Sequence, residues 1–367
     1  MVGRGQHFGD HEHTGSRDRS APEARMICCR IPVRRQTIHP GSPAPATPRT
    51  RRRVALGLCA ALGLTCAGTV LAVRAFAHGG YLASGDPLTG SYAEEAADGD
   101  AAADALLSGP YTERPAPPRA ITRMTAGQET AVRGKPAEPP VSQPLQAAPT
   151  AASAPIGPLF SPGNDGDADH HCTASVVHSA ARDLVVTAAH CVYDGGFRTN
   201  LVFAPGYHDG VVPYGVWVPS RIVVDPRWAD RRDEDHDVAF LRVRRPRGSG
   251  PAGQRVEDLT GAERIRFSPP GGLPTRTVGY PDDRETPVSC RNTTTAGSGQ
   301  LRFDCAGFPN GTSGGPMLTA VDPDTGLGTV TGVIGGLEEG GDDETSYSSW
   351  FGRDIAALYR RATTDGA

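Results

Sequence analysis

Lysine is almost absent from this chain of 367 residues: Lys135 is the single example, and arginine supplies the other positive side chains. Aromatic residues are also scarce, at 6%. With 38% hydrophobic and 21% charged residues, the composition argues against a polytopic membrane protein. Residues 1–53 hold 11 Arg against four acids, whereas the rest of the chain holds 26 basic and 37 acidic residues. Because nucleic-acid binding requires a basic surface, this acidic main body argues against a nucleic-acid partner.

CxxC motifs, which are typical of zinc sites, are missing among the eight cysteines. Four cysteines lie in the first 66 residues, and the other four are Cys172, Cys191, Cys290 and Cys305. The second group allows three disulfide pairings, of which the simplest joins sequence neighbours, Cys172 to Cys191 and Cys290 to Cys305. A metal site is the competing interpretation. Disulfides would place this part of the chain in an oxidising compartment.

A long uncharged run covers residues 54–73, after four arginines between residues 49 and 53 and before Ala-Phe-Ala at residues 75–77. A positive region, an apolar stretch and a small-residue cleavage site predict a secretory signal peptide within residues 1–77. The run is also long enough to remain as a membrane anchor. We therefore expect a secreted, extracellular protein, or one anchored to the outer face of the cell membrane, with no other membrane contact.

Residues 78–155 are rich in Ala, Pro, Gly and Thr and have few aromatic residues. Such a composition buries too little apolar surface to offset the entropy that a chain loses on folding. We therefore expect this segment to be a disordered linker or propeptide. The composition does not distinguish an inhibitory role from a folding or tethering role.

From residue 156 onward, short β-like runs alternate with turns rich in Gly, Pro and Asp. These runs cover residues 184–188, 201–204, 238–243 and 328–334. Strands at this spacing, with few helical stretches, predict an all-β sandwich or barrel. A Pro/Gly/Arg linker at residues 245–253 divides the region into residues 156–247 and 254–367. The one good helical pattern, residues 354–362, opens with an Asp cap and ends in arginines that suit the helix dipole.

Three short motifs contain side chains suited to nucleophilic catalysis. Residues 310–316 read NGTSGGP and place Ser313 between glycines, as an exposed nucleophile on a tight turn requires. His190 ends a hydrophobic run and precedes a cysteine, and Asp237 separates an acidic run from an apolar one. Taken singly, each motif has an ordinary structural explanation: a Gly/Ser turn, a His at a strand end and a solvated acidic loop.

The order of these motifs along the chain distinguishes between two classes of hydrolase. Residues 311–315 also fit the G-x-S-x-G pattern of α/β-hydrolases, in which the catalytic His follows the Ser. No His follows Ser313 in this sequence, which excludes that class. The order His190, Asp237, Ser313 is the one used by chymotrypsin-like enzymes.

Residues 156–367 resemble the trypsin/chymotrypsin family of serine peptidases, and in particular the secreted bacterial branch that includes the glutamyl endopeptidases. The resemblance rests on three blocks in the family's order: CTASVV before TAAHC (residues 172–177 and 187–191), DVAFL (237–241) and GTSGGP (311–316). It implies an all-β fold of two six-stranded antiparallel Greek-key β-barrels with a C-terminal helix. Residues 156–247 would form the first barrel and residues 254–367 the second, with Cys172 and Cys191 bridged around the His.

The resemblance also implies acyl transfer by a catalytic triad. Ser313 attacks the carbonyl carbon, His190 transfers the proton, and Asp237 fixes the imidazole tautomer. The backbone N–H groups of Gly311 and Ser313 form the oxyanion hole, and no metal or cofactor is required. We expect an exported, monomeric serine endopeptidase that acts on protein or peptide substrates and loses activity near pH 6–7. The alternatives are a protease-like binding protein without turnover and a serine esterase on the same fold.

One departure from the family pattern concerns activation. Thr312 stands where animal-type members have an Asp that pairs with the newly freed N-terminus. A threonine cannot form that ion pair. We therefore predict that a free α-amino group at Ile156 is not essential for activity, and strict dependence on that terminus would contradict the prediction.

A second departure concerns substrate specificity. Gly307 stands where trypsin has its pocket-base Asp, so a preference for Lys or Arg is not predicted. Residues 333–337 resemble the strand that lines the pocket and pairs with the substrate backbone. Within this strand Ile334 replaces the His of glutamyl-specific members, and Gly335 and Gly336 follow it as candidate substrate-binding residues. The substrate therefore stays undefined beyond a protein or peptide.

Overall fold

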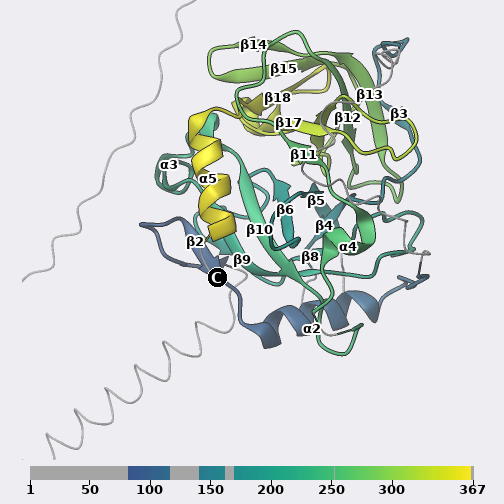
Figure 1. Cartoon of the computed structure of the whole chain (residues 1–367), viewed down its shortest axis with the longest axis vertical. Coiled ribbons are helices and arrows are strands. Elements are labelled where there is room, and N and C mark those ends of the chain that lie inside the picture. The colour runs from purple at the N-terminus through teal and green to yellow at the C-terminus, as the bar shows by residue number, and fades with distance from the viewer. Residues whose placement is uncertain (1–81, 116–139, 162–168, 252, 365–367) are drawn as a thin grey trace, which may run out of the picture. The chain divides into compact units, whose positions relative to one another are not determined.

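The computed structural model describes residues 82–115, 140–161, 169–251 and 253–364, and consists mainly of β strands joined by turns (Figure 1). All of these residues belong to one unit, residues 69–367. The predicted signal peptide, with its apolar run at residues 54–73, lies outside the described residues. In the part of the chain that is described, no helix is both long and apolar enough to cross a membrane.

The first half of the fold is a seven-stranded antiparallel sheet in the order β2-β9-β10-β6-β5-β4-β8. Its strands are β2 (Ser91–Ala93), β4 (Ile156–Phe160), β5 (His170–Val177), β6 (Leu184–Thr187), β8 (Val202–Phe203), β9 (Val218–Val224) and β10 (Ala239–Arg244). In β6, Val185 and Val186 belong to two different buried clusters, because successive side chains of a strand point to opposite faces. Both faces of this sheet are therefore covered, which explains why the strands read as nearly continuous hydrophobic runs.

The second half contains a six-stranded sheet in the order β11-β17-β16-β12-β13-β3 and a three-stranded sheet in the order β14-β15-β18. Their strands are β3 (Ala148–Pro149), β11 (Arg264–Ile265), β12 (Pro274–Gly279), β13 (Val288–Thr293), β14 (Thr295–Gly297), β15 (Gln300–Asp304), β16 (Pro316–Thr319), β17 (Thr329–Val333) and β18 (Thr345–Ser349). The β11–β17 pair is parallel, and the other pairs in these two sheets are antiparallel. Short helical segments join the strands: α3 (Pro226–Arg231), η1 (Glu234–His236), α4 (Val256–Thr260) and η2 (Leu337–Gly340).

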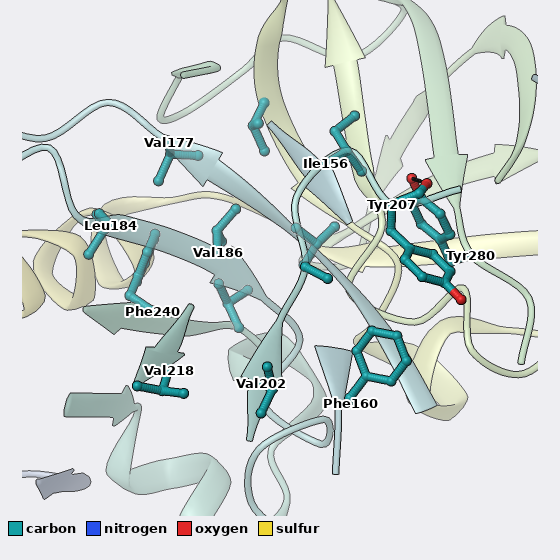
Figure 2. Packing of buried hydrophobic residues seen from close by; sticks show 14 of the residues in the cluster. Ile156, Phe160, Val177, Leu184, Val186, Val202, Tyr207, Val218, Phe240 and Tyr280 are labelled. Atoms are coloured by element: carbon teal, nitrogen blue, oxygen red, sulfur yellow. Dashed lines mark hydrogen bonds between the residues drawn. The ribbon is translucent and has the colours of Figure 1, made fainter. Parts of the chain in front are cut away.

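A shared hydrophobic core joins the two halves. Val186 and Phe240 of the first sheet lie in the same buried cluster as Tyr280, which follows β12 of the second half (Figure 2). Helix α5 (Arg353–Thr364) packs against β9 and β10 and adds Ile355 and Leu358 to this cluster. The predicted all-β, chymotrypsin-like fold with a C-terminal helix is confirmed. The helix begins at Arg353, so the predicted Asp cap lies inside its first turn.

Parts of the segment expected to be disordered form short strands and a helix that pack on the rest of the fold. Strand β1 (Leu82–Ala83) pairs with β7 (Phe197–Arg198), β2 pairs with β9, and β3 pairs with β13. Helix α2 (Ala96–Leu107) buries Leu106 completely in the shared core. The expectation of disorder therefore fails for residues 82–115 and 140–155. Sheet edges offer backbone hydrogen bonds to a strand of almost any composition, and a few well-placed apolar side chains dock the helix.

Candidate active site

His190 is presented by a turn that follows β6 and is tied down by a disulfide. Strand β5 carries Cys172, and a bond from Cys172 to Cys191 holds the residue next to His190, with the two Cα atoms 6.0 Å apart. A second disulfide joins Cys290 to Cys305. Both predicted pairings are confirmed. The sulfur atoms are bonded to each other, so they offer no thiolates to a metal.

Asp237 lies between η1 and β10 and is completely buried. Its Oδ2 lies 2.8 Å from His190 Nδ1 and accepts a hydrogen bond of 2.8 Å from the Gly336 N–H. Its Oδ1 accepts the backbone N–H of His190 at 2.9 Å. Because an ionised carboxylate only accepts hydrogen bonds, His190 Nδ1 carries the hydrogen and Nε2 is free to accept a proton. The two hydrogen bonds to Asp237 therefore hold the His190 ring with Nδ1 facing the carboxylate.

The Asp237 carboxylate affects the pKa of His190. Burial alone would lower the pKa of His190, but the charge of Asp237 and its hydrogen bond outweigh burial. The pKa of His190 is therefore raised above its ordinary value. The ring of Trp228, in α3, lies 6.4 Å from the imidazole between centroids and helps to enclose it.

Ser313 lies on a turn that precedes β16 and rests against the strands leading to His190. The Ser313 carbonyl accepts the Thr173 N–H of β5 at 2.7 Å, and the Gly314 N–H donates to the Ile334 carbonyl at 2.7 Å. A Cβ atom at Gly314 would collide with Thr187 Oγ1 and Thr173 O, so the turn can approach β5 and β6 only because this residue is glycine. In the described ranges no hydrogen bond joins Ser313 Oγ to His190; such contacts are often long in enzymes without a bound substrate.

The two backbone N–H groups expected to form the oxyanion hole belong to peptide units whose carbonyl oxygens accept hydrogen bonds. The Asn310 carbonyl accepts the Asp282 N–H, and the Thr312 carbonyl accepts the Gly315 N–H, both at 2.9 Å. In a trans peptide the N–H points away from the carbonyl, so these bonds orient the N–H groups of Gly311 and Ser313. Neither N–H has an acceptor among the described residues, which leaves both available to an incoming oxygen.

The candidate substrate-binding residues lie close to this site but do not form the expected extended strand. Strand β17 ends at Val333, Ile334 is buried in an apolar cluster, and η2 begins at Leu337. Gly336 donates its N–H to Asp237 instead of continuing the strand. Gly307 donates its N–H to the Asp343 carbonyl at 3.0 Å. A Cβ atom added at Gly307 would contact Gln146 and Ala147, which come from the segment expected to be disordered.

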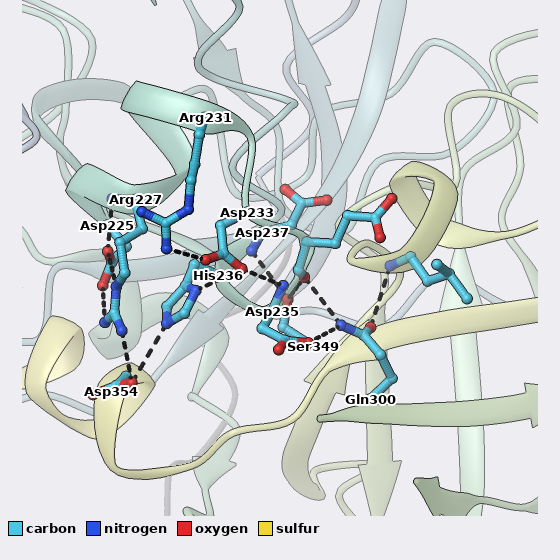
Figure 3. Close-up of polar contacts among 12 residues, drawn as sticks. Asp225, Arg227, Arg231, Asp233, Asp235, His236, Asp237, Gln300, Ser349 and Asp354 are labelled. Carbon is cyan, nitrogen blue, oxygen red and sulfur yellow. Dashed lines mark hydrogen bonds and ion pairs between the residues drawn. The ribbon is translucent and has the colours of Figure 1, made fainter. Parts of the chain in front are cut away.

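Three further residues support Asp237: the sequence analysis gave one of them, Gly336, a different role in substrate binding, and it did not identify the other two. They are Gly336, whose backbone N–H reaches the carboxylate, and Gln300, whose amide packs against Gly336. The third is Ser349, whose Oγ accepts the Asp237 N–H at 3.0 Å (Figure 3). Ser349 and Gln300 belong to no motif that the sequence analysis recognised. Ser349 Oγ also donates to the Glu234 carbonyl at 2.8 Å, so η1 is anchored to β18.

An all-β fold in two halves, with a His paired to a buried Asp in one half and a glycine-flanked serine in the other, is typical of chymotrypsin-like serine peptidases. Residues 172–322 match the model of a trypsin-like peptidase domain. None of the curated proteins compared with the chain matches it.

Solved structures of bacterial proteases resemble the chain over somewhat more than half its length. Protease Anisep from Arthrobacter nicotinovorans is 25% identical, with a TM-score of 0.52 over 60% of this chain and 100% of that one. The thermostable serine protease AL20, from an extremophilic microorganism, is 30% identical, with a TM-score of 0.51 over 58% of this chain and 99% of that one. A Glu endopeptidase is 15% identical, with a TM-score of 0.47 over 60% and 97%. The chain belongs to the trypsin-like serine peptidase family.

Proposed function

We propose that this protein is an exported serine endopeptidase that hydrolyses peptide bonds through an acyl-enzyme. The observation that carries the proposal is the contact of 2.8 Å between Oδ2 of the buried Asp237 and Nδ1 of His190, next to a serine turn with two backbone N–H groups that have no acceptor among the described residues. Membership of the peptidase family favours a protein or peptide as substrate. The two disulfides favour export, because such bonds persist in oxidising compartments.

The proposed mechanism assigns one role to each group. Ser313 Oγ attacks the carbonyl carbon while His190 Nε2 removes its proton, and His190 then returns that proton to the leaving amine. Asp237 stabilises the imidazolium that forms between these steps. The Gly311 and Ser313 N–H groups donate to the oxyanion, and losing one such donor typically costs about 2.7–4 kcal/mol of transition-state stabilisation. Water then hydrolyses the acyl-enzyme by the same route.

This mechanism does not need a free amino group at Ile156. Ile156 starts β4 and is completely buried, and its backbone N–H donates to the Ser153 carbonyl at 3.0 Å, so the ordered chain continues upstream of it. Thr312 Oγ1 donates to the Pro309 carbonyl at 2.6 Å and stabilises the nucleophile turn locally. We therefore propose that the site is organised without the ion pair that activates animal-type relatives.

Fluorophosphonate labelling tests the nucleophile. We expect one adduct by intact mass in the secreted protein and none in Ser313→Ala. The matched control is Ser298→Ala, which removes an exposed serine from the turn between β14 and β15 and should label normally. An adduct that survives in Ser313→Ala, or no adduct on the folded wild-type protein, contradicts the proposal. Comparing ester with peptide turnover then distinguishes an esterase from a peptidase.

The pH dependence of kcat/KM tests His190. Activity requires the neutral imidazole, and the pKa of His190 is raised, so activity should be present above that pKa and be lost as the pH falls through it. The acid limb should therefore lie above the ordinary histidine value of about 6.5. His178→Gln, which changes an exposed histidine, should leave the limb unmoved. A profile that stays flat down to about pH 4 contradicts the assignment.

A further inference from the structure

Gln300 connects the two halves of the fold immediately behind Asp237. The residue opens β15 and is buried, with 8% of its surface exposed. Its Nε2 donates to the Glu234 carbonyl at 3.1 Å and to Asp235 Oδ1 at 2.8 Å, both in the first half (Figure 3). Its Oε1 accepts the Leu337 N–H of the second half at 3.2 Å. Because two partners only accept and the third only donates, they fix the orientation of the amide.

The Gln300 amide is also packed against the glycine that serves Asp237. A Cβ atom at Gly336 would collide with Gln300 Oε1, so the amide lies directly on Gly336. Gly336 has φ +83° and ψ −128°, a conformation that only glycine adopts readily. Glycine also visits many other conformations, so neighbouring contacts must select this one. Two consecutive N–H groups do so, because Gly336 donates to Asp237 and Leu337 donates to Gln300.

We propose that Gln300 is a positioning residue that fixes the Gly336–Leu337 backbone and thereby delivers the Gly336 N–H to Asp237. This inference rests on the proposed function. The Gly336 N–H is the one donor to the Asp237 carboxylate, among the described residues, that comes from the second half; the other two come from His190. Through Gln300, the packing of the second half against the first therefore affects how well the negative charge of Asp237 is stabilised beside His190.

The residue type matters because the amide must donate at one end and accept at the other. Methionine has a similar length but forms neither set of hydrogen bonds. Glutamate can accept the Leu337 N–H, but when ionised it cannot donate, and it places a second negative charge beside Asp235. Glutamine is the side chain of this size that satisfies all three partners.

Loss of the Gln300 contacts should have a specific electrostatic effect. Without the Gly336 N–H, the negative charge of Asp237 is less stabilised by hydrogen bonds and interacts more strongly with the imidazolium, so the pKa of His190 should rise further. The other charged or titratable groups that act on His190 are Glu339 of η2, Arg198 of β7 and His171 of β5. None of these contacts Gln300, whose charged neighbour is Asp235.

The test compares Gln300→Met with the wild type and with Arg302→Ala. Arg302 lies two residues further along β15, is exposed, and pairs with Asp304. For Gln300→Met we expect kcat to fall about tenfold with KM within about twofold, which corresponds to the loss of one hydrogen bond to a charged group. The acid limb of kcat/KM should move upward by about half a pH unit, and the downfield proton resonance of His190 Nδ1–H should shift. Arg302→Ala should match the wild type in all three readouts.

The outcomes separate this inference from the proposed function. If the folded wild type does not label at Ser313, the proposed function fails. The His190 Nδ1–H resonance is then the remaining test of the positioning role of Gln300. If the wild type labels and Gln300→Met has the same kcat, acid limb and resonance, the inference is overturned. If Gln300→Met does not unfold cooperatively, Gln300→Glu replaces it in the same three measurements. Its activity should fall further at pH values where the new carboxyl ionises, and a wild-type profile in Gln300→Glu also overturns the inference.

Discussion

Replacement of Asp237 by asparagine should lower kcat by about four orders of magnitude while the protein stays folded. Asparagine has the same size as aspartate, but one of its two polar atoms becomes a donor. Both carboxylate oxygens of Asp237 accept N–H groups, Oδ1 one and Oδ2 two. An NH₂ group at the Oδ1 position would face the His190 backbone N–H. At the Oδ2 position it would face the Gly336 N–H and donate to His190 Nδ1, which moves the imidazole hydrogen to Nε2.

Either orientation damages general-base catalysis, and the second abolishes it, because a protonated Nε2 cannot accept the Ser313 proton. The measurement is kcat with a peptide substrate above the acid limb, together with a thermal unfolding curve. Asp230→Asn is the matched control, since it makes the same change at an exposed position of α3. A folded Asp237→Asn protein with kcat within tenfold of the wild type would remove Asp237 from the mechanism.

Local sequence patterns were sufficient to predict the candidate catalytic residues. A serine between glycines, a histidine beside a cysteine and an aspartate at the start of an apolar run are each readable within a few residues. Their chain order then selected one class of hydrolase. The structure brings His190 and Asp237 into hydrogen-bond contact and seats the Ser313 turn on β5. The disulfide pairing was equally accessible, because each bridge joins sequence neighbours.

The contacts that hold these residues in place could not be predicted, because they join residues far apart in the sequence and follow no recognisable motif. Gln300 lies 66 residues from Glu234, and Gly336 lies 99 residues from Asp237. Gly336 acts through a backbone N–H, which every residue except proline carries. The strand predicted through Leu337 stops at Val333 for a related reason. Two successive glycines allow the chain to turn, and the Asp237 carboxylate and the Gln300 amide determine where it does.

Replacement of Leu106 by alanine should lower the free energy of unfolding by about 2–5 kcal/mol. Leu106 is completely buried where α2 packs on the first sheet, and the substitution leaves a cavity in the core shared by the two halves. Leu88→Ala is the matched control in the same segment, because Leu88 is 88% exposed, and it should cost less than about 0.5 kcal/mol. Urea unfolding followed by tryptophan fluorescence measures both variants. Equal, small effects would mean that α2 is not part of the cooperatively folded unit.

The same pair of variants distinguishes a removable propeptide from an integral part of the enzyme. Strand β1 pairs with β7, which follows His190 by seven residues, and Phe197 of β7 lies in the same buried cluster as Cys191. If residues 82–115 are integral, weakening their attachment should loosen the turn that presents His190, and activity should fall along with stability. An inhibitory propeptide predicts the opposite, because its release would expose an intact site and raise kcat/KM. A rise in activity in Leu106→Ala, with Leu88→Ala unchanged, would therefore assign inhibition to this segment.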